Sequence, residues 1–232
     1  TPVHESGLLG MNSDALWNLN NDIVPGYRAL SDAVHAEGGR ILAQLAHSGG
    51  TVLINQPGLE SWAASPVRSE INGNIAHEMT LAEIHEVIDA HAEGAKRAAA
   101  GGMDGVEILG AFGFLPQAFL SPLTNHRTDK YGGALKNRLR FLMELLEAVR
   151  GALGRDHVLG VRLPGDEFEP GALDLEQMKI ICKQIADTGL IDYLNIIAHT
   201  NITHLGRSSH WAPTPTRHGI FVHLAGAIRE AV

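Results

Sequence analysis

The stretch Asp104-Gly-Val-Glu-Ile-Leu109 decides the fold, because it is short, mostly apolar and placed between two long amphipathic segments. Such a run predicts a strand buried on both faces, which is typical of parallel sheets covered by helices. Three further runs of the same character lie at residues 40–45, 158–163 and 191–197. The sequence therefore predicts a parallel α/β sheet that contains these four strands.

The segments between these runs carry the signals of helices. Thr80-Leu-Ala-Glu83 matches a capping box, and Asp174 is a second candidate N-cap. Three further helices are expected after Gly133 and over residues 22–37 and 219–232. Repeated strand–helix units connect through right-handed crossovers, which leaves either a doubly wound sheet or a (β/α)8 barrel.

The number of strands bears on the extent of the barrel. A closed (β/α)8 barrel needs eight strands and typically about 250 residues, whereas four strands are evident in this chain of 232 residues. We therefore expect the middle part of a larger barrel. No linker-like or low-complexity segment divides the chain, so residues 1–232 are expected to form one domain.

Composition excludes several classes of function. The formal net charge is −8, and no basic stripe interleaved with aromatic residues is present, which argues against nucleic-acid binding. A single cysteine, Cys182, excludes an internal disulfide and favours a reducing compartment. No apolar stretch is long enough to span a bilayer. A cytoplasmic protein without a membrane partner is expected.

The loop after the first predicted strand begins Gln44-Leu-Ala-His47. Gln44 offers one carbonyl and one amide group, the complement of a ring imide such as a flavin pyrimidine. On the residues alone, a strand residue satisfied by neighbouring backbone is the preferred interpretation. His47 has three possible roles, as a ligand-binding residue, as an acid or as an ordinary loop histidine.

Arg162 lies inside an otherwise apolar strand, where a guanidinium is costly to bury unless it is paired. Two interpretations remain open. Arg162 pairs either with a structural carboxylate such as Glu107, or with an anionic ligand in the mouth of the barrel.

The loop at residues 198–210 is rich in histidine. His199 and His204 are five residues apart, without an HxH pair, an HExxH motif or a cysteine companion, so no metal site is expected. A polar substrate loop containing His199 is the preferred interpretation.

One long motif is far more specific than these single residues. Pro122-Leu-Thr-Asn-His-Arg-Thr-Asp-Lys-Tyr-Gly-Gly133, together with Gln44-Leu-Ala-His47, Gly105-Val-Glu-Ile108 and Val161-Arg162, closely resembles the old yellow enzyme family of flavin-dependent oxidoreductases. The resemblance runs over essentially the whole chain. The most similar branch contains the dienoyl-CoA reductases and trimethylamine dehydrogenase.

The resemblance implies a (β/α)8 barrel with FMN across its C-terminal mouth, and NAD(P)H as a candidate electron donor. On this alignment the four strands are the third to sixth of the barrel, whereas the family's FMN phosphate site lies on the seventh and eighth. Gln44 and Arg162 match residues that hold the flavin pyrimidine. Arg127, Asp129 and Tyr131 match a loop that is mostly structural.

The resemblance also implies a departure at the substrate side. Family members usually place a His, then Asn or His three residues later, and often a Tyr two positions further, after the fourth strand. Here these positions are Leu109, Phe112 and Phe114. The loop therefore lacks the donors that activate an enone carbonyl.

Three accounts of the activity follow from this departure. The protein oxidises or demethylates an amine, or it reduces an alkene with a donor from His47 or His199, or it is a flavin-free or degenerate barrel with a non-redox binding role. We prefer an FMN-dependent oxidoreductase acting on a small molecule, with catalytic residues unassigned. His47, Leu109, Phe112, Phe114 and His199 are the expected substrate-side residues, and homo-oligomers are expected.

Overall fold

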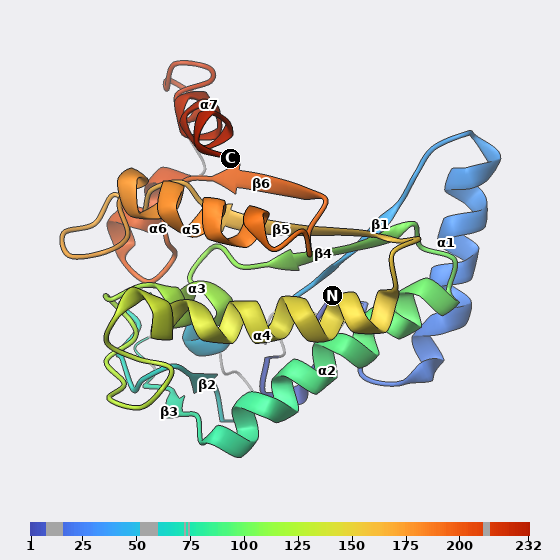
Figure 1. The fold of residues 1–232 in the computed structure, drawn as a ribbon, viewed down its shortest axis with the longest axis horizontal. Coiled ribbons are helices and arrows are strands. Elements are labelled where there is room, and N and C mark those ends of the chain that lie inside the picture. The colour runs from blue at the N-terminus through green and yellow to red at the C-terminus, as the bar shows by residue number, and fades with distance from the viewer. Residues whose placement is uncertain (8–15, 52–59, 72, 74, 211–213) are drawn as a thin grey trace.

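The computed structural model describes residues 1–7, 16–51, 60–71, 73, 75–210 and 214–232. At its centre lies a parallel sheet in the order β1 (Leu42–Leu45), β4 (Gly105–Leu109), β5 (Val158–Pro164) and β6 (Tyr193–Ile197) (Figure 1). The four predicted strands are confirmed. The strands follow one another in chain order without a reversal, whereas a doubly wound sheet requires one. This topology selects the barrel arrangement.

The first residues of the chain lie along the free edge of β1. Pro2 forms a parallel bridge with Ala46; Ala46 N donates to Thr1 O at 3.1 Å, and Val3 N donates to Ala46 O at 3.3 Å. A short extended segment thus continues the sheet beyond β1.

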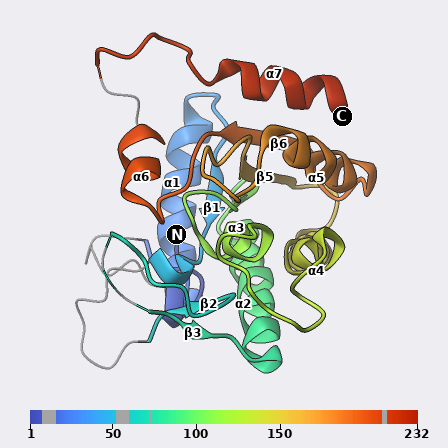
Figure 2. The ribbon, with the colours of Figure 1, turned by 90° about the vertical axis from the view of Figure 1, so that its left-hand side faces the viewer.

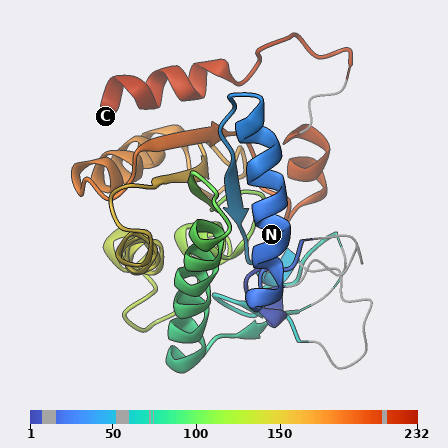
Figure 3. The ribbon, with the colours of Figure 1, turned by 90° about the vertical axis from the view of Figure 1, so that its right-hand side faces the viewer.

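The helices lie around the outside of the curved sheet, with α7 on the β6 side and α2 on the opposite side (Figure 2, Figure 3). The long helices are α1 (Val24–Ala36), α2 (Leu81–Ala100), α4 (Leu135–Leu153), α5 (Leu175–Asp187) and α7 (Val222–Ala231). The predicted capping box of α2 is present, because Thr80 accepts from Glu83 N and Glu83 accepts from Thr80 N. Asp174 caps α5 through Gln177 N.

The structure adds elements that the sequence did not predict. They are the short helices α3 (Leu115–Leu120) and α6 (His204–His210), a two-stranded sheet of β2 (Trp62–Ala63) and β3 (His77–Glu78), and the single 3-10 turns η1 (Glu5–Gly7), η2 (Asn21–Ile23) and η3 (Gly49–Thr51). The predicted loop at 198–210 is thus partly helical. The helix expected over 22–37 begins with η2, and the one expected over 219–232 starts at Val222.

The loop that carries the long motif packs around Arg127. Its guanidinium donates to Asp129 at 2.6 Å and to the carbonyl oxygens of Ala64 and Met79 at 3.1 and 2.7 Å. Tyr131 is fully buried, and its hydroxyl donates to Glu144 at 2.7 Å. These contacts tie the loop to the residues that directly follow β2 and β3, and to α4, so the motif serves the architecture beneath the site.

Candidate active site at the mouth of the barrel

Polar side chains of neighbouring strands meet inside the curved sheet. Gln44 is the register partner of Glu107, and Arg162 is the register partner of both Leu109 and Asn195. Side chains that share a register row point to the same face of a sheet. The strands therefore bring the two predicted cofactor residues, Gln44 and Arg162, to one side of the sheet.

Glu107 is the centre of this polar group. Gln44 Nε2 donates to Glu107 Oε1 at 2.6 Å, while Tyr193 Oη and Asn195 Nδ2 each donate to Glu107 Oε2 at 3.0 Å. Burial, followed by the nearby Glu107 carboxylate, raises the pKa of Tyr193. Its hydroxyl therefore stays protonated and donates to the carboxylate.

Glu107 bonds Gln44, Tyr193 and Asn195 and not Arg162, so the pairing of Arg162 with Glu107 that the sequence left open is wrong. The guanidinium instead lies over the ring of Phe112, with Cζ 5.0 Å from the ring centroid. Arg162 Nε is buried and has no hydrogen-bond partner among the described residues. A buried donor without a partner is costly, so this atom fits a site that a ligand completes.

The substrate-side loop forms an apolar wall next to Arg162. Leu109 and Phe114 are 5% and 8% exposed and cluster with Ala46 and Ala111, and Phe112 packs against this cluster. The rings of Phe112 and Phe114 meet edge to face, with centroids 6.3 Å apart. The structure thus brings together all three apolar residues predicted for this wall, none of which carries a side-chain donor.

His199 lies in an aromatic cluster after β6. Its ring is 4.7 Å from that of Phe168 and 5.2 Å from that of Phe221. Phe112, Phe168 and His199 all have positive φ, at 62°, 53° and 68°. Non-glycine residues in this conformation cluster at functional sites. One such residue follows each of β4, β5 and β6.

His47 has no exposed surface for a substrate. The ring is 0% exposed; Nδ1 accepts from Gly49 N at 3.1 Å and Nε2 bonds Ser6 Oγ at 2.9 Å. Burial lowers the pKa of His47, so the ring is neutral. In this structure the residue holds the loop after β1 rather than facing a ligand, which differs from the predicted substrate-side role.

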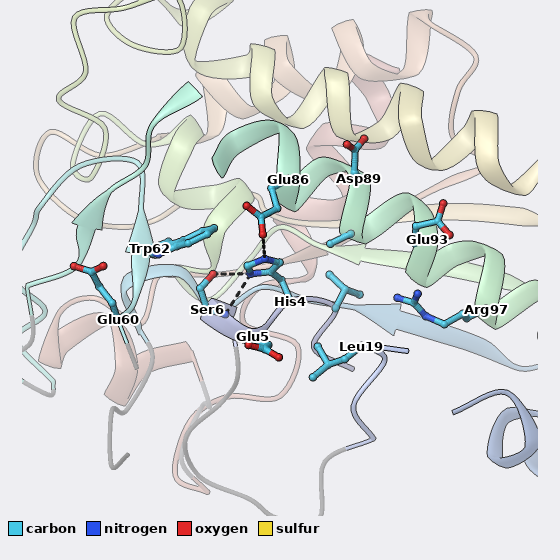
Figure 4. Close-up of a pocket in the computed structure, with 12 residues that line it drawn as sticks. His4, Glu5, Ser6, Leu19, Glu60, Trp62, Glu86, Asp89, Glu93 and Arg97 are labelled. Carbon is cyan, nitrogen blue, oxygen red and sulfur yellow. Dashed lines mark hydrogen bonds and ion pairs between the residues drawn. The ribbon is translucent and has the colours of Figure 1, made fainter. Parts of the chain in front are cut away.

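The bond to Ser6 continues outward to a separate acidic pocket of about 640 Å³ (Figure 4). Ser6 Oγ bonds His4 Nδ1 at 2.8 Å, and His4 Nε2 bonds Glu86 at 3.0 Å. The pocket is lined mainly by the N-terminal segment, Trp62 and α2. It contains none of the residues predicted for the cofactor or the substrate.

Several residues of the mouth were not predicted from the sequence. Tyr193 and Asn195 occupy alternate positions of β6, and this period of two could have marked them as facing the interior. Phe168 and Phe221 gave no such signal, because their loops bring them to His199 only in the folded chain. Within the described ranges, no three His, Cys, Asp or Glu side chains are grouped to hold a metal ion. No described helix is long and apolar enough to cross a membrane.

A family model described as the NADH:flavin oxidoreductase / NADH oxidase family matches residues 2–219. The chain belongs to this family. It is 37% identical over 225 residues to a metal reductase of Desulforamulus reducens, covering 95% of this chain and 32% of the relative. It is 33% identical over 240 residues to an N,N-dimethylglycine/sarcosine dehydrogenase of Chromohalobacter salexigens, covering 98% of this chain and 34% of the relative. The chain thus spans about a third of the length of these relatives.

Solved structures of the family agree with the barrel topology. The chain superimposes on 2-naphthoyl-CoA reductase with a TM-score of 0.88 and 30% identity, covering 99% of this chain and 36% of that one. The old yellow enzyme homologue from Zymomonas mobilis gives a TM-score of 0.81 and 28% identity, covering 99% and 64%. The sheet is therefore part of a TIM barrel, and the resemblance to old yellow enzymes is confirmed.

Proposed function

We propose that the chain is the flavin-holding part of an FMN-dependent oxidoreductase that acts on a small organic molecule. NAD(P)H would be the electron donor for a substrate that is reduced, whereas an amine substrate would itself be the donor and a separate electron acceptor would reoxidise the flavin. The observation that carries this proposal is Arg162, a charged residue in the mouth whose buried Nε has no partner among the described residues. Membership of the flavin oxidoreductase family supports it.

The residues present fit a flavin ring. Bound FMN supplies the hydride-transfer chemistry, which no side chain can perform. Gln44 would recognise the ring imide, because its amide combines an acceptor with donors. Arg162 would place a positive charge beside the pyrimidine end and favour negative charge on the ring.

The apolar wall favours oxidation or demethylation of an amine over reduction of an enone. Leu109, Phe112 and Phe114 provide no donor to a carbonyl oxygen. Of the two alternative donors, His47 is fully buried, and His199 packs in the aromatic cluster after β6. Oxidation at a carbon next to nitrogen requires no such donor, and an ammonium group is attracted to aromatic faces. The sarcosine dehydrogenase relative acts on substrates of this class by its name.

Arg162→Ala tests the cofactor assignment. We expect FMN affinity, measured by titration of flavin fluorescence, to fall by at least about tenfold, since a charge-assisted contact is worth about 1.5–3 kcal/mol. Arg155→Ala is the matched control, because Arg155 precedes the N-terminal end of the same strand and is exposed to solvent at its bond to Gly189 O. Unchanged affinity in Arg162→Ala would remove Arg162 from the cofactor site, whereas a lack of FMN binding by the unaltered protein would support a flavin-free barrel.

A further inference from the structure

Glu107 is a buried carboxylate, 7% exposed, that faces three donors. Among the described residues no salt bridge joins it to a lysine or arginine, and Arg162 lies over the ring of Phe112 instead. A buried carboxylate is costly in free energy unless it accepts hydrogen bonds, and those of Glu107 replace a salt bridge. The bonds of Glu107 also come from two different strands on either side of it, β1 and β6.

The neighbouring strand is shaped to allow this arrangement. Gly160 of β5 lies between Glu107 and Tyr193 in the register. A Cβ atom at Gly160 would lie only 2.1 Å from Tyr193 Cζ, so only glycine leaves room for the phenol to reach Glu107. Three strands thus contribute to holding one carboxylate against Gln44.

We propose that Glu107 is a positioning residue that fixes the Gln44 amide so that its carbonyl and second N–H face the flavin ring. This inference rests on the proposed function. Of the two ends of an amide, a carboxylate accepts from the N–H and repels the carbonyl oxygen, so Glu107 selects one of the two amide orientations. The amide group that remains has one acceptor and one donor, which matches the N–H and C=O of a ring imide.

A double-variant cycle tests whether Glu107 acts through Gln44. We expect Glu107→Gln and Gln44→Ala each to weaken FMN binding about tenfold, the scale of one buried hydrogen bond. The double variant should bind no more weakly than Gln44→Ala alone, because the two residues act as one unit. The absorption spectrum of bound FMN should change in the same way in all three variants.

The matched control is Glu167→Gln. Glu167 is also a buried carboxylate with three donors, namely Gln117 Nε2 at 2.5 Å, Ser121 Oγ at 2.6 Å and Leu173 N at 2.8 Å. It lies in the loop after β5, and its replacement should leave FMN affinity unchanged. If Glu107→Gln does not fold, Glu107→Asp takes its place in the cycle with the same expectation.

The outcomes separate this inference from the proposed function. Penalties that multiply to about a hundredfold in the double variant would overturn the positioning role while leaving FMN binding intact. A Glu107→Gln variant that binds FMN as tightly as the unaltered protein would also overturn the positioning role. An unaltered protein that takes up no FMN would overturn the proposed function, and this inference with it.

Discussion

Glu107 is buried and Arg162 is half-buried in the mouth of the barrel, and the two charged side chains differ in how their polar atoms are satisfied. Glu107 accepts three hydrogen bonds from the protein, whereas Arg162 Nε is left without a partner among the described residues. A carboxylate satisfied by the protein fits the scaffold, and an unpartnered donor at the mouth of the barrel fits a site that a ligand completes. This contrast supports the different role proposed for each charge.

Restoring polar residues to the wall should change the substrate preference. Leu109→His combined with Phe112→Asn would place donors where a carbonyl oxygen could be held, and one such donor is worth about a hundredfold in rate. We expect the double variant to gain reduction of 2-cyclohexen-1-one, measured by NADPH consumption with FMN present, and to lose activity toward sarcosine. Phe114→Leu, which adds no donor, is the control. Equal enone reduction in the unaltered protein would contradict the proposed preference.

At the residue scale, the sequence predicted where the candidate site residues lie better than it predicted what they touch. Arg162 was identifiable because an arginine inside an apolar strand needs a reason. The contact of Arg162 with Phe112 could not be predicted from the sequence, because it depends on the positive φ of Phe112 after β4. The burial of His47 was equally hidden, since its partner Ser6 is 41 residues away in sequence.

At the element scale, strong local signals were reliable and short elements were missed. The capping box at Thr80 marks the start of α2 correctly, and all four apolar runs are strands. Helix α3 has six residues, and the strands β2 and β3 have two each. Elements this short form through tertiary contacts rather than local propensity, so the sequence carries little sign of them.

Helix α2 also makes stability depend on pH through His91. The ring is fully buried; Nδ1 donates to Val87 O at 2.8 Å and Nε2 has no partner among the described residues. Burial, with a further effect of His4, lowers the pKa of His91 to about 4. The unfolded chain, with a histidine pKa of about 6.5, then binds more protons between these two values, so this stability is present above pH 6.5 and lost as the pH falls.

We expect His91 to lower the free energy of unfolding by about 2 kcal/mol at pH 5 relative to pH 7, which corresponds to a fall in Tm of about 4–8 °C. His91→Leu should lose correspondingly less Tm over this range in thermal unfolding followed by circular dichroism. His47 remains in both proteins, and because His91 also lowers the pKa of His47, the difference reports His91 together with its effect on His47. Identical losses in the two proteins would show that His91 does not titrate on unfolding.

At the scale of the whole molecule, the open edge of the sheet is the main feature. Within the described residues β6 pairs only with β5, and all five of its residues are half-buried, whereas β4 is buried throughout. An apolar groove of about 400 Å³ runs between β6 and α7, lined by Ile191, Leu194, Ile196, Ala225, Ile228 and Val232 among others. An unpaired strand beside apolar side chains favours association.

The 232-residue chain should therefore associate in solution. We expect size-exclusion chromatography with light scattering to give a mass above that of the 24.9 kDa monomer, increasing with protein concentration. Ile196→Lys, which places a charge in the groove, should shift the distribution toward the monomer. A monodisperse monomer at high concentration would contradict this expectation.

The most direct test of whether this chain binds FMN is the visible absorption spectrum of the purified protein, before and after heat release of any bound ligand. We expect the bands of oxidised flavin, with FMN in the released fraction. A colourless protein that also fails to take up added FMN would contradict it, and would leave a barrel that retains the family's fold without its cofactor.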